Sequence, residues 1–259
     1  MDEKLKITTR GQGPDLVLLH GWAMHSGIWG GLVDSLAADH HVNLVDLPGH
    51  GVNRHVPLSD DLDEVADLIL SRLPPAVWIG WSLGGLVTLA AALRQPGMVQ
   101  KAILVAATPS FARQPGWECG VEPAAQRAFS DGLNNNAEDT LAQFWQQCFG
   151  AGWVEHSMRL LGKSSLTDGL PAQRDLEAGL QLLYGNDLRT ESKTCEVPTL
   201  FLGGTRDRTI VPESFTRAAD LMPLAGARLI RAAGHAPFMT HPDTFLDIIR
   251  VFARGEKAT

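Results

Sequence analysis

The sequence has few cysteines and no long apolar run. Cys119, Cys148 and Cys195 are odd in number and lack C-x-x-C spacing, which predicts reduced thiols rather than a disulfide framework or a zinc site. The start, MDEKLKITTR, is charged and lacks the apolar stretch of a secretory signal, and no later run is long enough to cross a bilayer. We therefore expect a cytoplasmic protein that does not associate with membranes.

Basic charge and clustered metal ligands are also scarce. The chain has 22 Lys and Arg against 29 Asp and Glu, a formal net charge of -7. Nucleic acids and anionic membranes attract proteins through a basic field, so neither partner is expected. The histidines are scattered, and the adjacent pair His40 and His41 would point to opposite sides of a strand. The sequence therefore predicts no metal and no other cofactor.

The chain does contain short apolar segments that alternate with amphipathic ones. Runs rich in Val, Leu and Ile occupy residues 16–20, 42–46, 77–81, 102–107 and 199–204. Helical periodicity fits residues 28–38, 62–73, 83–93, 212–222 and 242–252. This alternation predicts an α/β fold with a mostly parallel sheet and helices on both faces. The segment KLKIT near the start is expected to be an antiparallel edge strand.

One interval contains no convincing strand. Residues 108–197 are far longer than the usual connection of about 2 to 6 residues. Helical patterns fit residues 123–133, 137–149, 154–161 and 171–184, with Pro123 and Pro171 in first helical turns. We predict a core formed by residues 1–108 and 191–259, with a helical cap subdomain at residues 109–190.

The segment IGWSLGGLV, residues 79–87, places Ser82 between a predicted strand and a predicted helix. In this setting G-x-S-x-G is typical of a strained turn that exposes a serine hydroxyl above the carboxyl edge of a sheet. Gly80 and Gly84 give this turn room, because a side chain there would press on a neighbouring element. The motif alone also fits a serine that only caps a helix, so the other motifs have to decide.

A serine nucleophile requires a base and an acid, which on this fold follow in the chain order Ser, Asp, His. His235 lies between a final strand candidate and the last helix, whereas His156 falls in the cap and His241 opens that helix. Asp207 directly follows the strand at 199–203. The sequence therefore predicts a triad of Ser82, Asp207 and His235.

Two backbone N–H groups are expected to bind the oxyanion that forms during ester cleavage. Leu83 follows the nucleophile at a helix start, where the helix dipole favours negative charge. Trp22 lies in the loop HGWAMH after the strand at 16–20. His20, at the start of this loop, is expected to bond backbone groups and hold the loop's shape rather than act as the base.

The motifs LLHGW, DLPGHG, GWSLGG, RDRTIVP and GHAPF together resemble the α/β-hydrolase superfamily along the whole chain. More narrowly, LVLLHGW, VDLPGHG, HAPFMTHP and the cap ending DLEAGLQLLYGNDLR resemble the pimeloyl-acyl carrier protein methyl ester esterases of biotin synthesis. This resemblance implies a cofactor-free serine carboxylesterase that cleaves the methyl ester of a pimeloyl chain on acyl carrier protein through an acyl-enzyme. It also implies substrate contacts from Trp22, Ser82, Leu83 and His235. The acyl site that it implies is lined by the cap segment FWQQC, which is Phe144, Trp145, Gln146, Gln147 and Cys148.

Two features depart from that family. Ala23 stands where many relatives have glycine, which constrains the oxyanion loop. The predicted cap is rich in acids, so its basic stretch for an acidic carrier protein is reduced to Arg159, Lys163 and Arg174. Arg159 and Lys163 are four residues apart on one side of a predicted helix and form the candidate docking pair; a solvated pair of charges is the alternative.

Three other functions remain open at this stage. The first two are a broad short-acyl carboxylesterase, which would act on small acyl esters, and a hydrolase that cleaves carbon–carbon bonds. The third is a ligand receptor that keeps the triad without turnover, which an intact Ser, Asp and His set disfavours. The chain is expected to be a monomer.

Overall fold

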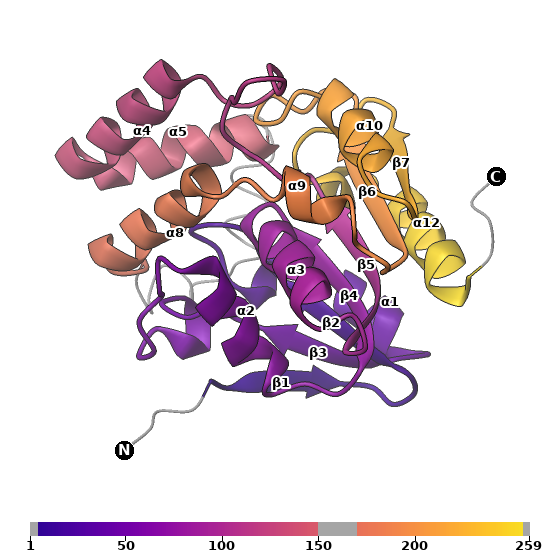
Figure 1. The fold of residues 1–259 in the computed structure, drawn as a ribbon. Coiled ribbons are helices and arrows are strands. Elements are labelled where there is room, and N and C mark those ends of the chain that lie inside the picture. Colours follow the sequence, from indigo (N-terminus) through magenta and orange to yellow (C-terminus); the bar gives the residue numbers. More distant parts are fainter. Residues whose placement is uncertain (1–4, 150–169, 256–259) are drawn as a thin grey trace.

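The computed structural model describes residues 5–149 and 170–255. Its centre is a seven-stranded sheet in the order β1-β3-β2-β4-β5-β6-β7 (Figure 1). The strands are β1 (Ile7–Arg10), β2 (Asp15–Leu19), β3 (His41–Val45), β4 (Ala76–Trp81), β5 (Val99–Val105), β6 (Thr199–Gly204) and β7 (Ala225–Ile230). Only β1 runs antiparallel to its neighbour, and the other pairs are parallel. The predicted α/β fold and its antiparallel first strand are confirmed.

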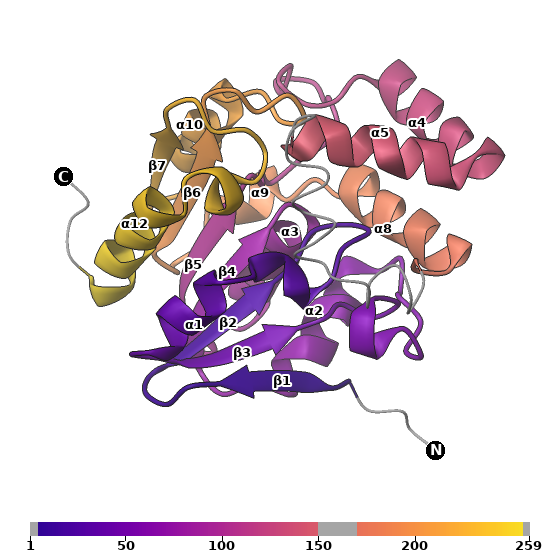
Figure 2. The ribbon, with the colours of Figure 1, turned by 180° about the vertical axis from the view of Figure 1, so that it is seen from behind.

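Helices cover both faces of this sheet. One face carries α2 (Leu62–Leu70), α3 (Leu83–Arg94) and α10 (Glu213–Asp220), and the other carries α1 (Leu32–Ala37) and α12 (Pro242–Arg254) (Figures 1 and 2). Alternate residues of β2 enter the two apolar layers: Val17 and Leu19 pack in the first, Leu16 and Leu18 in the second. A strand covered on both faces has no solvent side, which is why its sequence is apolar without alternation.

Two helix predictions differ from the structure. Residues 28–38 do not form one helix: a short 3-10 turn, η1 (Ser26–Trp29), ends at Gly30 before α1 begins. The φ of Gly30 is 48°, a conformation that glycine adopts readily and that breaks the helical run. The helix predicted from Pro171 starts two residues later: α8 spans Gln173–Gly185, and Pro171 precedes its first turn.

The helices of residues 109–190 lie beyond the carboxyl ends of the strands. There α4 (Pro123–Asn135), with Pro123 in its first turn, and α5 (Ala137–Phe149) form a group with α8 in Figures 1 and 2. The helix expected at 154–161 lies outside the described residues, and the division into core and cap stays a prediction. The short elements are η2 (Gly51–Asn53), α9 (Arg189–Ser192) and α11 (Pro237–Thr240). Within the two described ranges, no helix has the length and apolarity to cross a membrane.

Candidate active site

Ser82 occupies a sharp turn between β4 and α3. Its backbone has φ 54° and ψ -116°, a conformation that costs energy for a residue with a side chain. A Cβ on Gly80 would overlap the carbonyl oxygen of Gly84, and a Cβ on Gly84 would lie 2.5 Å from the carbonyl oxygen of His20. The two glycines therefore allow the close packing of β4, α3 and β2 that this turn requires, as the sequence predicted.

His235 and Asp207 form a buried pair beside this turn. The Nδ1–H of His235 donates to Asp207 Oδ2 at 2.9 Å, and both side chains are 0% exposed. The other Asp207 oxygen accepts the backbone N–H groups of Thr209 and Ile210 at 2.8 and 2.9 Å, which fix the carboxylate. The remaining ring nitrogen, His235 Nε2, has no hydrogen-bond partner among the described residues. Since Nδ1 carries the proton, Nε2 is an acceptor in the neutral ring.

Trp81 joins the loop that carries His235 to the turn at Ser82. Its indole N–H donates to the carbonyl oxygen of His235 at 2.9 Å, and the two rings lie 5.7 Å apart between centroids. Trp81 directly precedes Ser82, so this contact holds His235 next to the turn at Ser82. Ser82 and Nε2 are not hydrogen-bonded here, which is common because catalytic hydrogen bonds tighten when substrate binds. The predicted Ser82, Asp207 and His235 are thus gathered at one edge of the sheet.

The loop after β2 lies against the same turn. A Cβ on Gly21 would lie 3.2 Å from Ser82 Cβ, so this loop runs directly past Ser82. The backbone N–H groups of Trp22 and Leu83 have no acceptor in the part of the chain that the structure describes. Ala23 has a φ of 56°, a conformation that glycine adopts more readily than alanine, so the loop is constrained at this residue.

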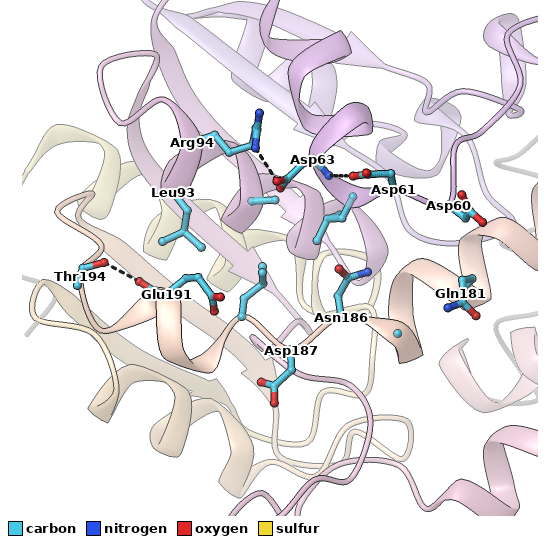
Figure 3. A pocket seen from close by; sticks show the side chains of 14 residues that line it. Asp60, Asp61, Asp63, Leu93, Arg94, Gln181, Asn186, Asp187, Glu191 and Thr194 are labelled. Atoms are coloured by element: carbon cyan, nitrogen blue, oxygen red, sulfur yellow. Dashed lines mark hydrogen bonds and ion pairs between the residues drawn. The ribbon is translucent and has the colours of Figure 1, made fainter.

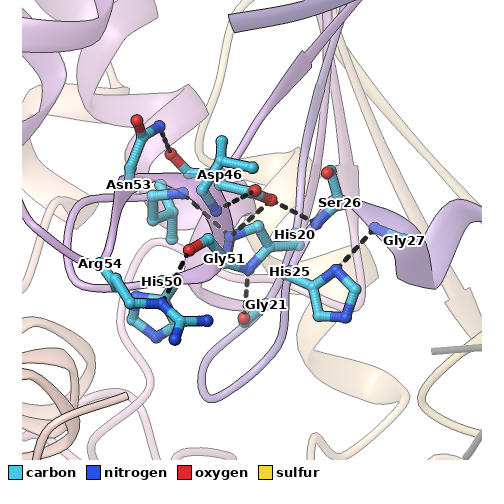
Figure 4. Close-up of polar contacts among 12 residues, drawn as sticks. His20, Gly21, His25, Ser26, Gly27, Asp46, His50, Gly51, Asn53 and Arg54 are labelled. Atoms are coloured by element: carbon cyan, nitrogen blue, oxygen red, sulfur yellow. Dashed lines mark hydrogen bonds and ion pairs between the residues drawn. The ribbon is translucent and has the colours of Figure 1, made fainter. Parts of the chain in front are cut away.

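His20 is a buried scaffold residue, as expected. Its Nδ1–H donates to the Gly21 carbonyl at 2.8 Å, and its Nε2 accepts the Leu47 N–H at 2.9 Å (Figure 4). Burial, followed by the neighbouring His50 ring, lowers the pKa of His20 to about 3, so the ring is neutral. The nearby Asp46 accepts backbone N–H groups with both oxygens. No lone pair is left on His20 to receive a proton from Ser82.

The first two residues of the FWQQC segment lie on α5, and one of them contacts Trp22. Phe144 and Trp145 are half-buried and contact both apolar layers. Phe144 meets the Trp22 ring edge-on, with 5.2 Å between centroids. Figure 1 shows α5, which carries both residues, above the strand ends. An apolar surface is thus placed beside the loop that passes Ser82.

The remaining three residues of this segment have different surroundings. Gln146 and Gln147 are exposed, and Gln147 donates its side-chain N–H to the carbonyl oxygen of Arg208 at 2.9 Å. Cys148 is buried, and burial raises the pKa of its thiol well above the usual range, so it is a neutral packing residue. The end of α5 therefore contacts the loop that holds Asp207. Arg159 and Lys163, the candidate docking pair, lie outside the described residues.

A separate pocket of about 920 Å³ lies between α2, α3, α8 and α9 (Figure 3). It contains none of the predicted catalytic residues. Its lining is acidic, which disfavours an acidic carrier protein at this face. The acids are Asp60, Asp61, Asp63, Asp187 and Glu191. Across residues 5–149 and 170–255, no group of three or more His, Cys, Asp or Glu side chains is arranged to hold a metal ion.

Sequence reasoning missed the contacts that hold the site together. The Trp81 bond to His235 and a bond from the Trp22 indole to the Leu176 carbonyl each join residues 154 positions apart. No local pattern indicates such partners, because they depend on how the sheet and the cap meet. The one local signal was a tryptophan in each of the two motifs: Trp81 directly before Ser82, and Trp22 in the loop HGWAMH.

Comparison with known proteins agrees with this geometry. The model of the family described as "Alpha/beta hydrolase family" matches residues 16–248. The pimeloyl-[acyl-carrier protein] methyl ester esterase of Nitrosomonas europaea is 41% identical over 248 residues, which cover 93% of this chain and 96% of that protein. The enzyme of the same name from Stenotrophomonas maltophilia is 41% identical over 240 residues, 92% of each chain.

A solved structure shows the same fold. An esterase from Exiguobacterium antarcticum superposes with a TM-score of 0.87 and 19% identity, over 96% of this chain and 95% of that one. At this identity the likeness concerns the fold alone. With a family match over most of its length and relatives above 40% identity, the chain belongs to the alpha/beta hydrolase family.

Proposed function

We propose that this protein is a serine carboxylesterase that hydrolyses the methyl ester of a pimeloyl chain carried by acyl carrier protein, a step of biotin synthesis. The relatives named for this activity align along nearly the whole chain, at about 40% identity. One observation carries the chemistry: the buried His235 is bonded to Asp207 through Nδ1, and its Nε2, near the strained Ser82, has no partner among the residues that the structure describes.

Ser82 is the proposed nucleophile, His235 the base and Asp207 the acid that orients the base. As the Ser82 oxygen bonds to the ester carbonyl carbon, its proton passes to His235 Nε2. The resulting imidazolium is stabilised by Asp207 and then protonates the leaving methoxide, which departs as methanol. A water molecule attacks the acyl-enzyme by the same route, and the products are free Ser82 and a carboxylic acid.

The oxyanion of each tetrahedral intermediate is bound by the N–H groups of Leu83 and Trp22. Both amides lack an acceptor in the described structure. Leu83 is the first residue of α3, where the helix dipole adds positive potential. Donors fixed before the reaction lower the barrier without having to reorganise, and one such donor is worth roughly 10²- to 10³-fold in kcat.

The acyl chain is proposed to lie along the cap surface that includes Phe144 and Trp145. Both side chains are half-buried and Phe144 contacts Trp22, which suits an apolar chain that is shielded from water. Gln146, Gln147 and Cys148 complete this proposed acyl site. The carrier protein would dock at Arg159 and Lys163, since a chain of net charge -7 attracts an acidic partner only through a local basic face. The protein is proposed to act in the cytoplasm as a monomer.

The test compares pimeloyl methyl ester linked to acyl carrier protein with the same ester free in solution. We expect a higher kcat/KM for the carrier-linked ester, and added salt should reduce this advantage by screening the docking charges. An R159E/K163E variant should lose the advantage while it keeps turnover of an uncharged phenyl ester. Equal turnover of the two pimeloyl esters, with faster turnover of short-chain esters, would instead identify a broad short-acyl carboxylesterase.

A further inference from the structure

Trp22 is held by the cap rather than by its own loop. Its indole N–H donates to the carbonyl oxygen of Leu176 on α8 at 2.9 Å. The ring also meets Phe129 of α4 and Phe144 of α5 edge-on, with centroid distances of 5.5 and 5.2 Å. Only 1% of Trp22 is exposed. The side chain is therefore fixed by three helices, while its backbone belongs to the loop beside Ser82.

The backbone of α8 lies directly on the indole. A Cβ placed on Gly179 would lie 2.5 Å from Trp22 Cδ1 and 2.9 Å from Nε1. Such distances are far inside van der Waals contact, so a side chain at this position would displace either the helix or the ring. Gly179 thus sets how closely α8 and Trp22 approach, although glycine is a poor residue for the interior of a helix.

Asp175 fixes the other side of α8 to the core. Only 1% of it is exposed, and its Oδ1 accepts the backbone N–H of Leu58 at 3.0 Å. A Cβ on Gly49 would lie 2.6 Å from its Cβ and Cγ, so the loop after β3 and the first turn of α8 are in close contact. Its other oxygen, Oδ2, is buried without a hydrogen-bond partner among the described residues, so the Leu58 N–H is the hydrogen bond that offsets part of the cost of burying this carboxylate. Asp175 therefore sets the position of α8 over the core one residue before the carbonyl that binds Trp22.

We propose that α8 positions the oxyanion donor, and that Asp175 and Gly179 are positioning residues for the Trp22 backbone N–H. Neither residue has to touch the substrate, since Asp175 acts through the helix and Gly179 acts by letting the indole ring of Trp22 lie against the helix. This inference rests on the proposed role of Trp22 in the oxyanion hole. A donor displaced by about 1 Å can cost roughly 10²-fold in rate, so the effect of these residues falls on kcat.

The test measures kcat and KM for a simple phenyl ester, with enzyme concentration set by phosphonate titration of Ser82. Gly179→Ala should lower kcat about 10- to 100-fold and leave KM within about 3-fold. Gly185→Ala is the matched control, because it adds the same methyl to the same helix against only the flexible Gln181 side chain. It should stay within about 2-fold of wild type.

The second pair of variants tests the link to the core. Asp175→Ala should lower kcat in the same way, and Asp175→Asn should restore most of it, because the amide oxygen still accepts the Leu58 N–H. A merely structural role would reduce the fraction of titratable enzyme but leave kcat per titrated site unchanged. That result, or equal kcat losses in Gly179→Ala and Gly185→Ala, would overturn the proposal. A phenyl ester separates this outcome from the substrate assignment: failure to cleave the carrier-linked ester would reject the assignment alone.

Discussion

His20 and His235 are two fully buried histidines, each beside an aspartate at the carboxyl edge of the sheet. His20 has both ring nitrogens bonded to backbone groups, and Asp46 bonds to backbone amides. His235 has one nitrogen bonded to Asp207 and the other without a partner in the described structure. Burial and a nearby carboxylate are common to both residues. The two residues differ in whether a ring nitrogen is free of hydrogen bonds to the described protein groups: His235 has one and is the proposed base, whereas His20 has none and holds the loop.

The strongest way to break this comparison is to remove the proposed base or its nucleophile. His235→Ala and Ser82→Ala should each lower kcat/KM about 10⁵-fold or more, and the double variant should be little worse because the two act as a unit. Hydrolysis of a phenyl ester by purified protein measures this, with urea unfolding as the check on folding. Substantial activity in folded Ser82→Ala would reject the assignment.

The two aspartates offer a matched pair of substitutions. Asp207→Asn should lose about 10⁴-fold in kcat while it stays folded, because an amide can hold the wrong tautomer of His235. Asp46→Asn should instead lower the free energy of unfolding by about 1 to 3 kcal/mol, because its carboxylate receives two backbone N–H groups. Steady-state kinetics and urea titrations on both variants separate the two roles. The comparison would be wrong if Asp46→Asn were the more damaging change to kcat.

The pH dependence of stability sharpens the contrast. The pKa of His20 is about 3 in the folded protein and about 6.5 when unfolded. Between these pH values the unfolded state therefore binds a proton that the folded state does not bind. Stability is therefore full above pH 6.5 and falls with decreasing pH, by about 2 kcal/mol at pH 5. Urea unfolding at pH 7.5 and 5 should show this loss, and His20→Asn should reduce it. An unchanged pH dependence in that variant would contradict a buried neutral His20.

The smallest effect is expected in the loop that His20 shapes. Ala23→Gly removes the cost of a positive φ but adds freedom to the unfolded chain, so the free energy of unfolding should change by less than about 1 kcal/mol. The kcat should stay within about 3-fold, since the loop's hydrogen bonds to His20 remain. Thermal melts and phenyl ester kinetics test both statements. A large gain in stability would show that the strain at Ala23 is greater than its φ of 56° indicates.

Much of this molecule follows from local sequence. Apolar runs identified the inner strands β2 to β6, because these strands are covered on both faces, whereas the edge strands β1 and β7 are partly exposed. The bounds of α5 were predicted correctly, since its periodicity starts and stops with clear signals. The motif around Ser82 predicted a strained turn because only glycine fits at 80 and 84. Gly30 was the exception, since a helical pattern on both sides concealed its positive φ.

The rest depends on contacts between distant residues. The role of α8 could not be predicted, because Gly179 has no meaning until Trp22 lies against it. Likewise, the tertiary structure is needed to see that His235 Nε2 has no hydrogen-bond partner within residues 5–149 and 170–255. Sequence patterns identify which residues can do chemistry. Tertiary structure decides which of their atoms remain available for it.

The bond between Trp81 and His235 has a consequence for the assembly of the enzyme. It joins β4, in the middle of the sheet, to the loop after β7, which is the edge strand. His235 is therefore in place near Ser82 only when β5, β6 and β7 have all paired on that side of β4. Pairings between distant segments close slowly, because chain entropy opposes them. During refolding, the return of ester hydrolysis should lag behind the return of secondary structure. The recovery of activity would then report when the sheet is complete.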